Sequence, residues 1–221
     1  PILVVLNNKT LSWLLSFLGA LACLFISILL MQTVSDGSIL TYYLGGWVPP
    51  IGIEYRIDAA NAILLFLISI ISAIVLIFSY SSLHAEIPEE KHTLFYSCFL
   101  LCLTGLLGVV ATADIFNVFV FLEISSLSTY VLVAQGAYLD RRALSSSFNY
   151  LIMGTIGATF FVIGIGYIYM ATGSLNMMDI AERVNQLSDN RTIQAGFAFI
   201  VVGMGLKLSL IHISEPTRLS L

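Results

Sequence analysis

Residues 114–136 read DIFNVFVFLEISSLSTYVLVAQG, an apolar segment long enough to cross a bilayer, with one carboxylate, Glu123, near its middle. In a helix that begins near Ile115 and rises about 1.5 Å per residue, Glu123 lies roughly 12 Å inside a hydrocarbon core about 30 Å thick. A charge at that depth is costly, so intramembrane acids usually face a helix bundle, pair with a cation or take up a proton. Ser126 and Tyr130 share its face at the helical period. The pattern predicts a functional carboxylate, with a purely structural buried acid as the alternative.

The composition is that of a membrane protein. The chain has 221 residues, of which 58% are hydrophobic and 10% charged, and its mean hydropathy is +0.97. Soluble domains carry about 25% charged residues. The net charge of −4 and the lack of a basic cluster argue against nucleic acid as a partner. No phosphate-binding or dinucleotide motif and no CxxC pair is present, so we expect no cofactor and no chemistry by this chain itself.

Cysteine and histidine residues do not form a ligand pattern. Cys98 and Cys102 share a helix face inside an apolar segment, but no histidine or second pair accompanies them, so no metal site is expected. His84 and His92 lie within the acidic loop LHAEIPEEKH, residues 83–92. Without a ligand cluster, both histidines are expected to be solvated loop residues.

The hydropathy pattern predicts an all-α, polytopic transmembrane helix bundle. Six spanning helices are expected, at residues 11–31, 59–80, 94–111, 115–135, 146–171 and 194–212. Residues 1–6 look like the end of another span.

Two connecting segments have patterns of their own. Residues 35–58 hold a Gly-Gly pair, a Pro-Pro pair and alternating aromatic and β-branched residues, which predicts a short hairpin or an extended surface loop. Residues 174–187 predict a short amphipathic helix at the membrane interface, capped by Asn176.

The distribution of basic residues suggests an orientation. On one side the predicted spans place Lys9, Lys91, Arg141 and Arg142, and on the other Arg56, Arg183 and Arg191. Since cytoplasmic loops carry an excess of Lys and Arg, the end that precedes the first span is predicted to be cytoplasmic. The N-terminus lacks the basic region of a signal peptide and an initiating Met, so we expect the chain to begin inside a longer protein.

A second intramembrane charge, Lys207, lies in GFAFIVVGMGLKLSLIHI, residues 196–213. A lysine at this depth tends to lose its proton unless an anion holds it, and snorkelling to the interface is the alternative. Two intramembrane charges of opposite sign favour a proton or cation path. In the preceding span, Gly154 and Ala158 form a small-xxx-small pair, which is typical of close helix packing.

Several of these segments resemble one known family. Residues 114–136 resemble the fifth helix of the antiporter-like membrane subunits shared by Mrp-type multisubunit cation/proton antiporters, complex I and membrane-bound hydrogenases. Residues 141–181 are similar in particular to the D subunit of the Mrp type, with the N subunit of complex I next. GMGLKLS, residues 203–209, resembles the family's seventh-helix lysine motif. The resemblance covers about residues 35–209.

The resemblance implies roles for the two charges. Glu123 falls on the family's fifth-helix glutamate and Lys207 on its seventh-helix lysine, a pair thought to gate proton movement. Ser126, Tyr130 and Thr159 are candidates for lining a water path. The implied fold is an antiporter-like bundle of two inverted five-helix repeats, of which this chain holds only part of the first.

Two departures from the family pattern bear on the interpretation. Asn149 stands where relatives of the complex I N type often have a basic residue, which favours the Mrp type. After Lys207 the family continues into a proline-broken helix, and His212 does not fall at its spacing. We therefore expect an incomplete antiporter-like domain over residues 1–209 and an atypical tail, foreign or truncated, over residues 210–221.

The sequence thus predicts an ion-translocating subunit of a multisubunit Na⁺(K⁺)/H⁺ antiporter that moves protons through Glu123 and Lys207 in a bacterial inner membrane. Its partners would be the lipid bilayer, protons, monovalent cations (Na⁺ or K⁺) and other membrane subunits of the same complex. Two alternatives stay open. One is a proton-pumping subunit of an NADH-quinone oxidoreductase or membrane-bound hydrogenase, and the other is a structural membrane scaffold.

Overall fold

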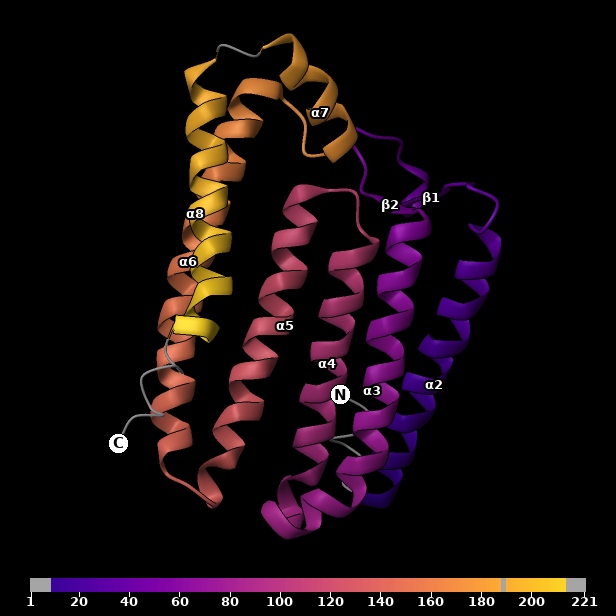
Figure 1. The fold of residues 1–221 in the computed structure, drawn as a ribbon, viewed down its shortest axis with the longest axis vertical. Helices are drawn as coiled ribbons and strands as arrows, with labels where there is room; N and C mark the ends of the chain where they lie inside the picture. The colour runs from indigo at the N-terminus through magenta and orange to yellow at the C-terminus, as the bar shows by residue number, and fades with distance from the viewer. Residues whose placement is uncertain (1–8, 188–189, 214–221) are drawn as a thin grey trace.

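The computed structural model describes residues 9–187 and 190–213, in which six long helices lie roughly side by side (Figure 1). Their bounds are α2 Lys9–Thr33, α3 Ala59–Glu86, α4 His92–Ala111, α5 Ile115–Gln135, α6 Arg142–Thr172 and α8 Arg191–Ile213. All six lie where the apolar windows predict spans. Within the described residues, α2 to α6 are each long and apolar enough to cross a membrane. The predicted all-α, multi-pass architecture is confirmed.

The helices form a group of three and a row of three. α2, α3 and α4 pack on one another, α5 packs on α4, α6 on α5 and α8 on α6. α6 and α8 therefore form one edge of the bundle, and α2 and α3 form the other (Figure 1). The glutamate on α5 and the lysine on α8 belong to helices separated in this row by α6.

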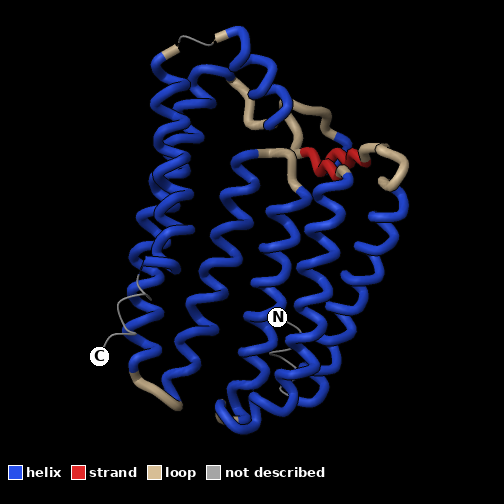
Figure 2. The backbone as a smooth tube through the Cα atoms, viewed as in Figure 1, coloured by secondary structure: helices blue, strands red, loops and turns tan. Residues whose placement is uncertain are grey.

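One end of the bundle carries the predicted hairpin and the predicted short helix (Figure 2). Strands β1 (Leu40–Tyr43) and β2 (Glu54–Ile57) pair antiparallel, with Leu40 opposite Ile57, and the short 3₁₀ helix η1 (Leu44–Gly46) follows β1. α7 (Met177–Gln186) lies at the same end (Figure 1). The Asn176 side chain caps it by accepting from the amides of Met178 and Asp179 at 3.0 and 3.3 Å, as predicted.

The opposite end holds two 3₁₀ turns, η2 (Glu89–Lys91) and η3 (Gly136–Tyr138). The Lys91 ammonium lies 4.7 Å from the centroid of the Tyr138 ring, so these two turns are neighbours. Arg56 in β2 and Arg183 in α7 lie at the hairpin end. This arrangement agrees with the division of basic residues between two sides, while the cytoplasmic assignment stays a prediction.

Aspartates begin two of the long helices. The Asp58 carboxylate accepts from the Asn61 amide at 2.9 Å at the start of α3, and Asp114 accepts from the Asn117 amide at 2.7 Å at the start of α5. Each side chain satisfies an amide that has no partner within its helix. The start of α5 fixes how far along the bundle Glu123 lies.

The buried apolar cluster lies among α2, α3 and α4, and consists of Ala20, Leu76, Leu83, Tyr96 and Leu103. Trp13 packs against it and donates its indole N–H to the Leu76 carbonyl at 2.9 Å. Elsewhere large apolar side chains point outward, as with Phe25 and Phe78, which are 62% and 69% exposed. Such a surface suits lipid or further helices rather than water.

One prediction is wrong, and others lie outside the described part of the chain. His92 is buried, not solvated, because α4 begins at this residue and its imidazole Nε2 lies 2.9 Å from the Ile87 carbonyl oxygen. The side chains of His84 and His212 lie outside the described residues. So do the expected span end at residues 1–6 and the last part of the tail, residues 214–221.

Candidate functional site

The two intramembrane charges meet. The Lys207 ammonium of α8 donates to Glu123 Oε1 of α5 at 2.8 Å, and its distance to the Ser126 hydroxyl oxygen is 3.5 Å. The side chains are 16% and 22% exposed, respectively. Both charges therefore lie largely out of solvent and compensate one another, which is the condition under which intramembrane charges persist. The alternative that Lys207 snorkels away from the bundle does not describe this arrangement.

α6 lies between the two helices that carry the pair. α5 packs on α6 and α6 packs on α8, while the backbones of α5 and α8 hardly approach each other over the described residues. The Glu123–Lys207 contact is thus made by two long side chains that reach across a gap between helices. Such a contact can open by side-chain rotation, without separating packed backbones.

Tyr130 lies one helical turn beyond Ser126 on α5, on the side predicted from the period. It is buried, and its hydroxyl lies against Gly154 of α6, so that a methyl group on Gly154 would overlap it. Its backbone carbonyl accepts from the Ser147 hydroxyl at 2.7 Å. From Glu123 toward the C-terminal end of α5, the space between α5 and α6 thus holds hydroxyl groups.

On the other side of Glu123, toward the N-terminal end of α5, aromatic rings lie between α5 and α6. Phe119 of α5 and Phe161 of α6 stack with ring centroids 6.5 Å apart. Phe119 lies one turn before Glu123, toward the hairpin end. The ion pair therefore has apolar rings on one side along α5 and hydroxyl groups on the other.

Thr159, the remaining predicted path residue, lies apart from the pair. Its side chain is exposed on α6, and its hydroxyl donates to the Thr155 carbonyl of the same helix at 2.8 Å. The face of α6 that meets α8 carries Gly157 and Gly164 instead. A role for Thr159 in a water path stays a prediction.

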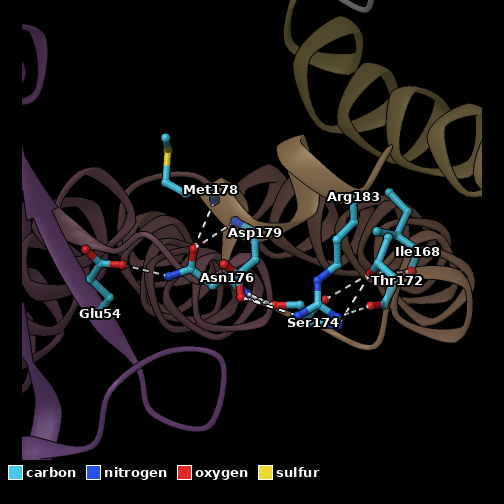
Figure 3. Close-up of polar contacts among 8 residues, drawn as sticks. All are labelled: Glu54, Ile168, Thr172, Ser174, Asn176, Met178, Asp179 and Arg183. Carbon is cyan, nitrogen blue, oxygen red and sulfur yellow. Dashed lines mark hydrogen bonds and ion pairs between the residues drawn. The ribbon is translucent and has the colours of Figure 1, made fainter. Parts of the chain in front are cut away.

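A second polar network, which sequence reasoning missed, joins distant segments at the hairpin end (Figure 3). The buried Glu54 carboxylate of β2 accepts from the Asn176 side-chain amide at 2.7 Å, across 122 residues of sequence. The backbone of Glu54 accepts from the Ala113 amide at 2.9 Å. The sequence predicts Asn176 as a helix cap, but no local pattern indicates its second partner.

The same network continues from Asn176 into α7. The Ser174 hydroxyl donates to Asp179 at 3.2 Å, and Arg183 donates to the Thr172 carbonyl at 2.6 Å (Figure 3). Nearby, burial raises the pKa of the Asp114 carboxyl above its usual value, and backbone amide hydrogen bonds oppose that rise. Together these contacts tie the hairpin, the α4–α5 connection and α7 into one cap over the helices.

Within the described ranges, no group of three or more His, Cys, Asp or Glu side chains is arranged to hold a metal ion. The Cys102 thiol instead lies 3.5 Å from the Thr129 hydroxyl.

Comparison with known proteins places this arrangement in a family. The family model described as "NADH:quinone oxidoreductase/Mrp antiporter, TM" matches residues 112–215, a range that contains both Glu123 and Lys207. Residues 112–215 belong to this antiporter-like family. The resemblance expected from the sequence is thereby confirmed.

Relatives of this antiporter-like chain come from two kinds of complex. It is 41% identical over 184 residues to the N subunit of the NADH-quinone oxidoreductase of Desulforudis audaxviator, a match that covers 83% of this chain and 36% of the relative. It is 29% identical over 201 residues to the D subunit of the Na(+)/H(+) antiporter of Alkalihalophilus pseudofirmus, which covers 91% and 40%. The chain thus spans well under half the length of these relatives.

Solved structures agree with the antiporter-like fold. A chain of the membrane-bound sulfane sulfur reductase, an archaeal respiratory membrane complex, matches with a TM-score of 0.83 and 33% identity, covering 92% of this chain and 41% of that one. A chain of the Mrp complex from a Dietzia species matches with a TM-score of 0.77 and 22% identity, covering 92% and 37%. At that identity the second match speaks for the fold alone.

Proposed function

We propose that Glu123 and Lys207 carry protons through a membrane subunit of a multisubunit Na⁺(K⁺)/H⁺ antiporter. The observation that supports this most is the 2.8 Å contact between the two side chains inside the helix bundle. The proposed location is a bacterial inner membrane, with other membrane subunits of the same complex as partners. The similarity to the D subunit of a Na(+)/H(+) antiporter supports this choice of machine.

In the proposed mechanism, the pair alternates between a closed and an open state. When closed, the Glu123 carboxylate stabilises the charge on Lys207. When the pair opens, the ammonium is left in a poorly solvated site without its anion, so its proton is released to the next group along the path.

The surroundings of the pair suggest a direction of supply. Ser126 and Tyr130 extend from Glu123 toward the C-terminal end of α5, whereas Phe119 and Phe161 stack on the other side. Hydroxyl groups can hold a chain of waters, and stacked rings cannot. We therefore propose that protons reach the pair from the end of α5 near Gln135, which is the predicted cytoplasmic end.

A second candidate has its own supporting observation. The identity to the N subunit of an NADH-quinone oxidoreductase is 41%, against 29% to the D subunit of the antiporter, and a respiratory complex provides a structure with 33% identity. In that case the same pair would move protons within a respiratory complex. Neighbouring genes would separate the two, since small antiporter subunits accompany one machine and iron–sulfur and quinone-site subunits the other.

The test uses the complete gene and its operon in a sodium-sensitive host. Inverted membrane vesicles are energised, and the loss of the pH gradient on addition of Na⁺ or K⁺ is measured for wild type, Glu123→Gln and Glu182→Gln. Glu182 is an exposed carboxylate on α7 and serves as a charge-matched control. We expect the Glu123 variant alone to lose cation-driven proton movement. A scaffold would keep it in both variants, and a respiratory subunit would show quinone-dependent pumping without exchange.

A further inference from the structure

Four glycines line the contact between α6 and α8. They are Gly157 and Gly164 of α6, and Gly196 and Gly203 of α8. Both pairs are spaced by seven residues, which is close to two helical turns, so each pair lies on one face. A methyl group added to Gly164 would lie 2.7 Å from the Gly196 carbonyl oxygen, and one added to Gly203 would lie 2.7 Å from the Gly157 carbonyl oxygen. We call this contact the glycine seam.

The lysine of the ion pair rests on one end of the glycine seam. A methyl group on Gly157 would lie 3.2 Å from Lys207 Cγ and 3.1 Å from the Gly203 carbonyl oxygen. The stem of Lys207 therefore lies over the bare backbone of α6. Gly203 precedes Lys207 by about one turn. Its contact with α6 therefore sets the distance between the Lys207 backbone and that helix.

The distance between the Lys207 backbone and α6 matters because α6 lies between α8 and α5. The backbones of α5 and α8 hardly approach each other over the described residues, so Lys207 reaches Glu123 only through the length of its side chain. An outward shift of α8 would lengthen the distance that the Lys207 side chain has to span to reach Glu123. At the glycine seam the backbones of α6 and α8 lie so close that an added methyl group would overlap the facing backbone.

We propose that Gly157 and Gly203 are positioning residues for the Glu123–Lys207 pair. They do not touch the transferred proton. Their missing side chains let α8 and the Lys207 stem lie against α6, which brings the ammonium to the carboxylate. The inference rests on the proposed function of the pair for its consequence in transport, but its geometric part can be tested without transport.

The experiment compares two matched substitutions in the complete subunit within its complex. Gly203→Ala and Gly164→Ala each place a methyl group 2.7 Å from a carbonyl oxygen of the facing helix, but Gly164 meets Gly196, at the other end of the seam from Lys207. Gly166→Ala, where nothing lies within 4 Å among the described residues, serves as the baseline. Thermal stability of each variant reports the packing defect itself.

The first readout is geometric. Cysteines at positions 123 and 207 (E123C and K207C), in a background without the native cysteines, are joined by a crosslinker as long as the two side chains. Because overpacking is relieved by backbone shifts, we expect Gly203→Ala to lower the crosslinking rate about tenfold and Gly164→Ala by less than about twofold. Equal losses in the two variants, or no loss in either, would overturn the proposal.

The second readout is cation-driven proton movement with Glu123 and Lys207 intact. We expect it to fall with the crosslinking rate, in Gly203→Ala only. If Gly203→Ala lowers crosslinking while Glu123→Gln leaves transport unchanged, the positioning role stands and the proposed function fails. If Gly203→Ala does not assemble, Gly157→Ala imposes a milder contact at 3.1–3.2 Å and should show the same loss of crosslinking to a smaller degree.

Discussion

The coupling between Glu123 and Lys207 can be measured by a double-mutant cycle. In Glu123→Gln the ammonium meets a neutral amide oxygen in place of the carboxylate, and the Ser126 hydroxyl lies 3.5 Å away. In Lys207→Met the carboxylate loses its cation. Each single change leaves one charge uncompensated inside the bundle, while the double variant removes both charges. The double variant should therefore cost less stability than the sum of the two single changes.

The expected size of the coupling free energy follows from how far the Glu123 and Lys207 side chains are exposed. Removing one partner of a fully buried pair costs about 3–5 kcal/mol, and exposed pairs contribute about 0.2–1 kcal/mol. With side chains 16% and 22% exposed, this pair lies nearer the buried limit but remains partly solvated. We expect a coupling free energy of about 1–3 kcal/mol, between the ranges of exposed and buried pairs.

The assay is unfolding of the purified complete subunit by titration with a denaturing detergent, with free energies compared at one temperature for wild type, both single variants and the double variant. The control cycle replaces the pair Asp179 and Arg183 on α7, whose charged atoms are 3.9 Å apart and whose side chains are more exposed. That cycle should give a coupling below about 1 kcal/mol. If the changes at Glu123 and Lys207 are additive within about 0.5 kcal/mol, the reasoning that the bundle holds a desolvated ion pair is refuted.

Three further predictions concern single positions. Gly154→Ala should displace the Tyr130 hydroxyl, because the added methyl group would overlap it. Proton supply to the pair should then slow by about tenfold, as measured by the initial rate of collapse of the pH gradient. An unchanged rate would exclude Tyr130 from the path. Asn176→Ala removes a helix cap and the amide that meets the buried Glu54 carboxylate, so the free energy of unfolding should fall by about 2–4 kcal/mol. Asn176→Ser keeps a cap and should lose less of this free energy. Equal losses in the two variants would contradict the capping role. Burial raises the folded-state pKa of Asp114, so the folded state binds this proton more tightly than the unfolded state. The stability contributed here therefore falls as pH rises from about 4, the usual pKa of an aspartate, through the raised folded-state pKa. Asp114→Asn, which keeps the cap, should flatten the dependence of the melting temperature on pH over that window.

Local patterns were enough to predict most of the elements. A span needs about 20 apolar residues wherever it occurs, so windows of hydropathy found the long helices. The cap of α7 was predictable because Asn176 and the amides it binds lie within three residues. The burial of His92 was not, because it depends on where α4 begins and on the Ile87 carbonyl that its imidazole meets, neither of which the loop composition encodes.

The contacts that matter for function connect residues far apart in sequence. Lys207 and Glu123 are separated by 84 positions, and Asn176 and Glu54 by 122. The helical period predicted correctly that Ser126 and Tyr130 lie on the side of Glu123, because all three belong to one helix. The period does not predict which face of α6 points toward α5 and which toward α8. For that reason it did not indicate that the Thr159 side chain is exposed in the described chain.

The orientation of α6 about its own axis determines which small residues lie next to the polar side chains of α5 and α8. Gly154 leaves room for a hydroxyl from α5, while Gly157, less than one turn further, leaves room for the lysine stem from α8. In the sequence Gly154 indicates only close packing, since a missing side chain does not say which neighbour occupies its place. In the structure the two glycines lie on two different sides of one helix, and each admits a polar side chain that a larger residue would exclude. Close packing at these two positions is therefore what permits a polar pair to form inside an otherwise apolar bundle.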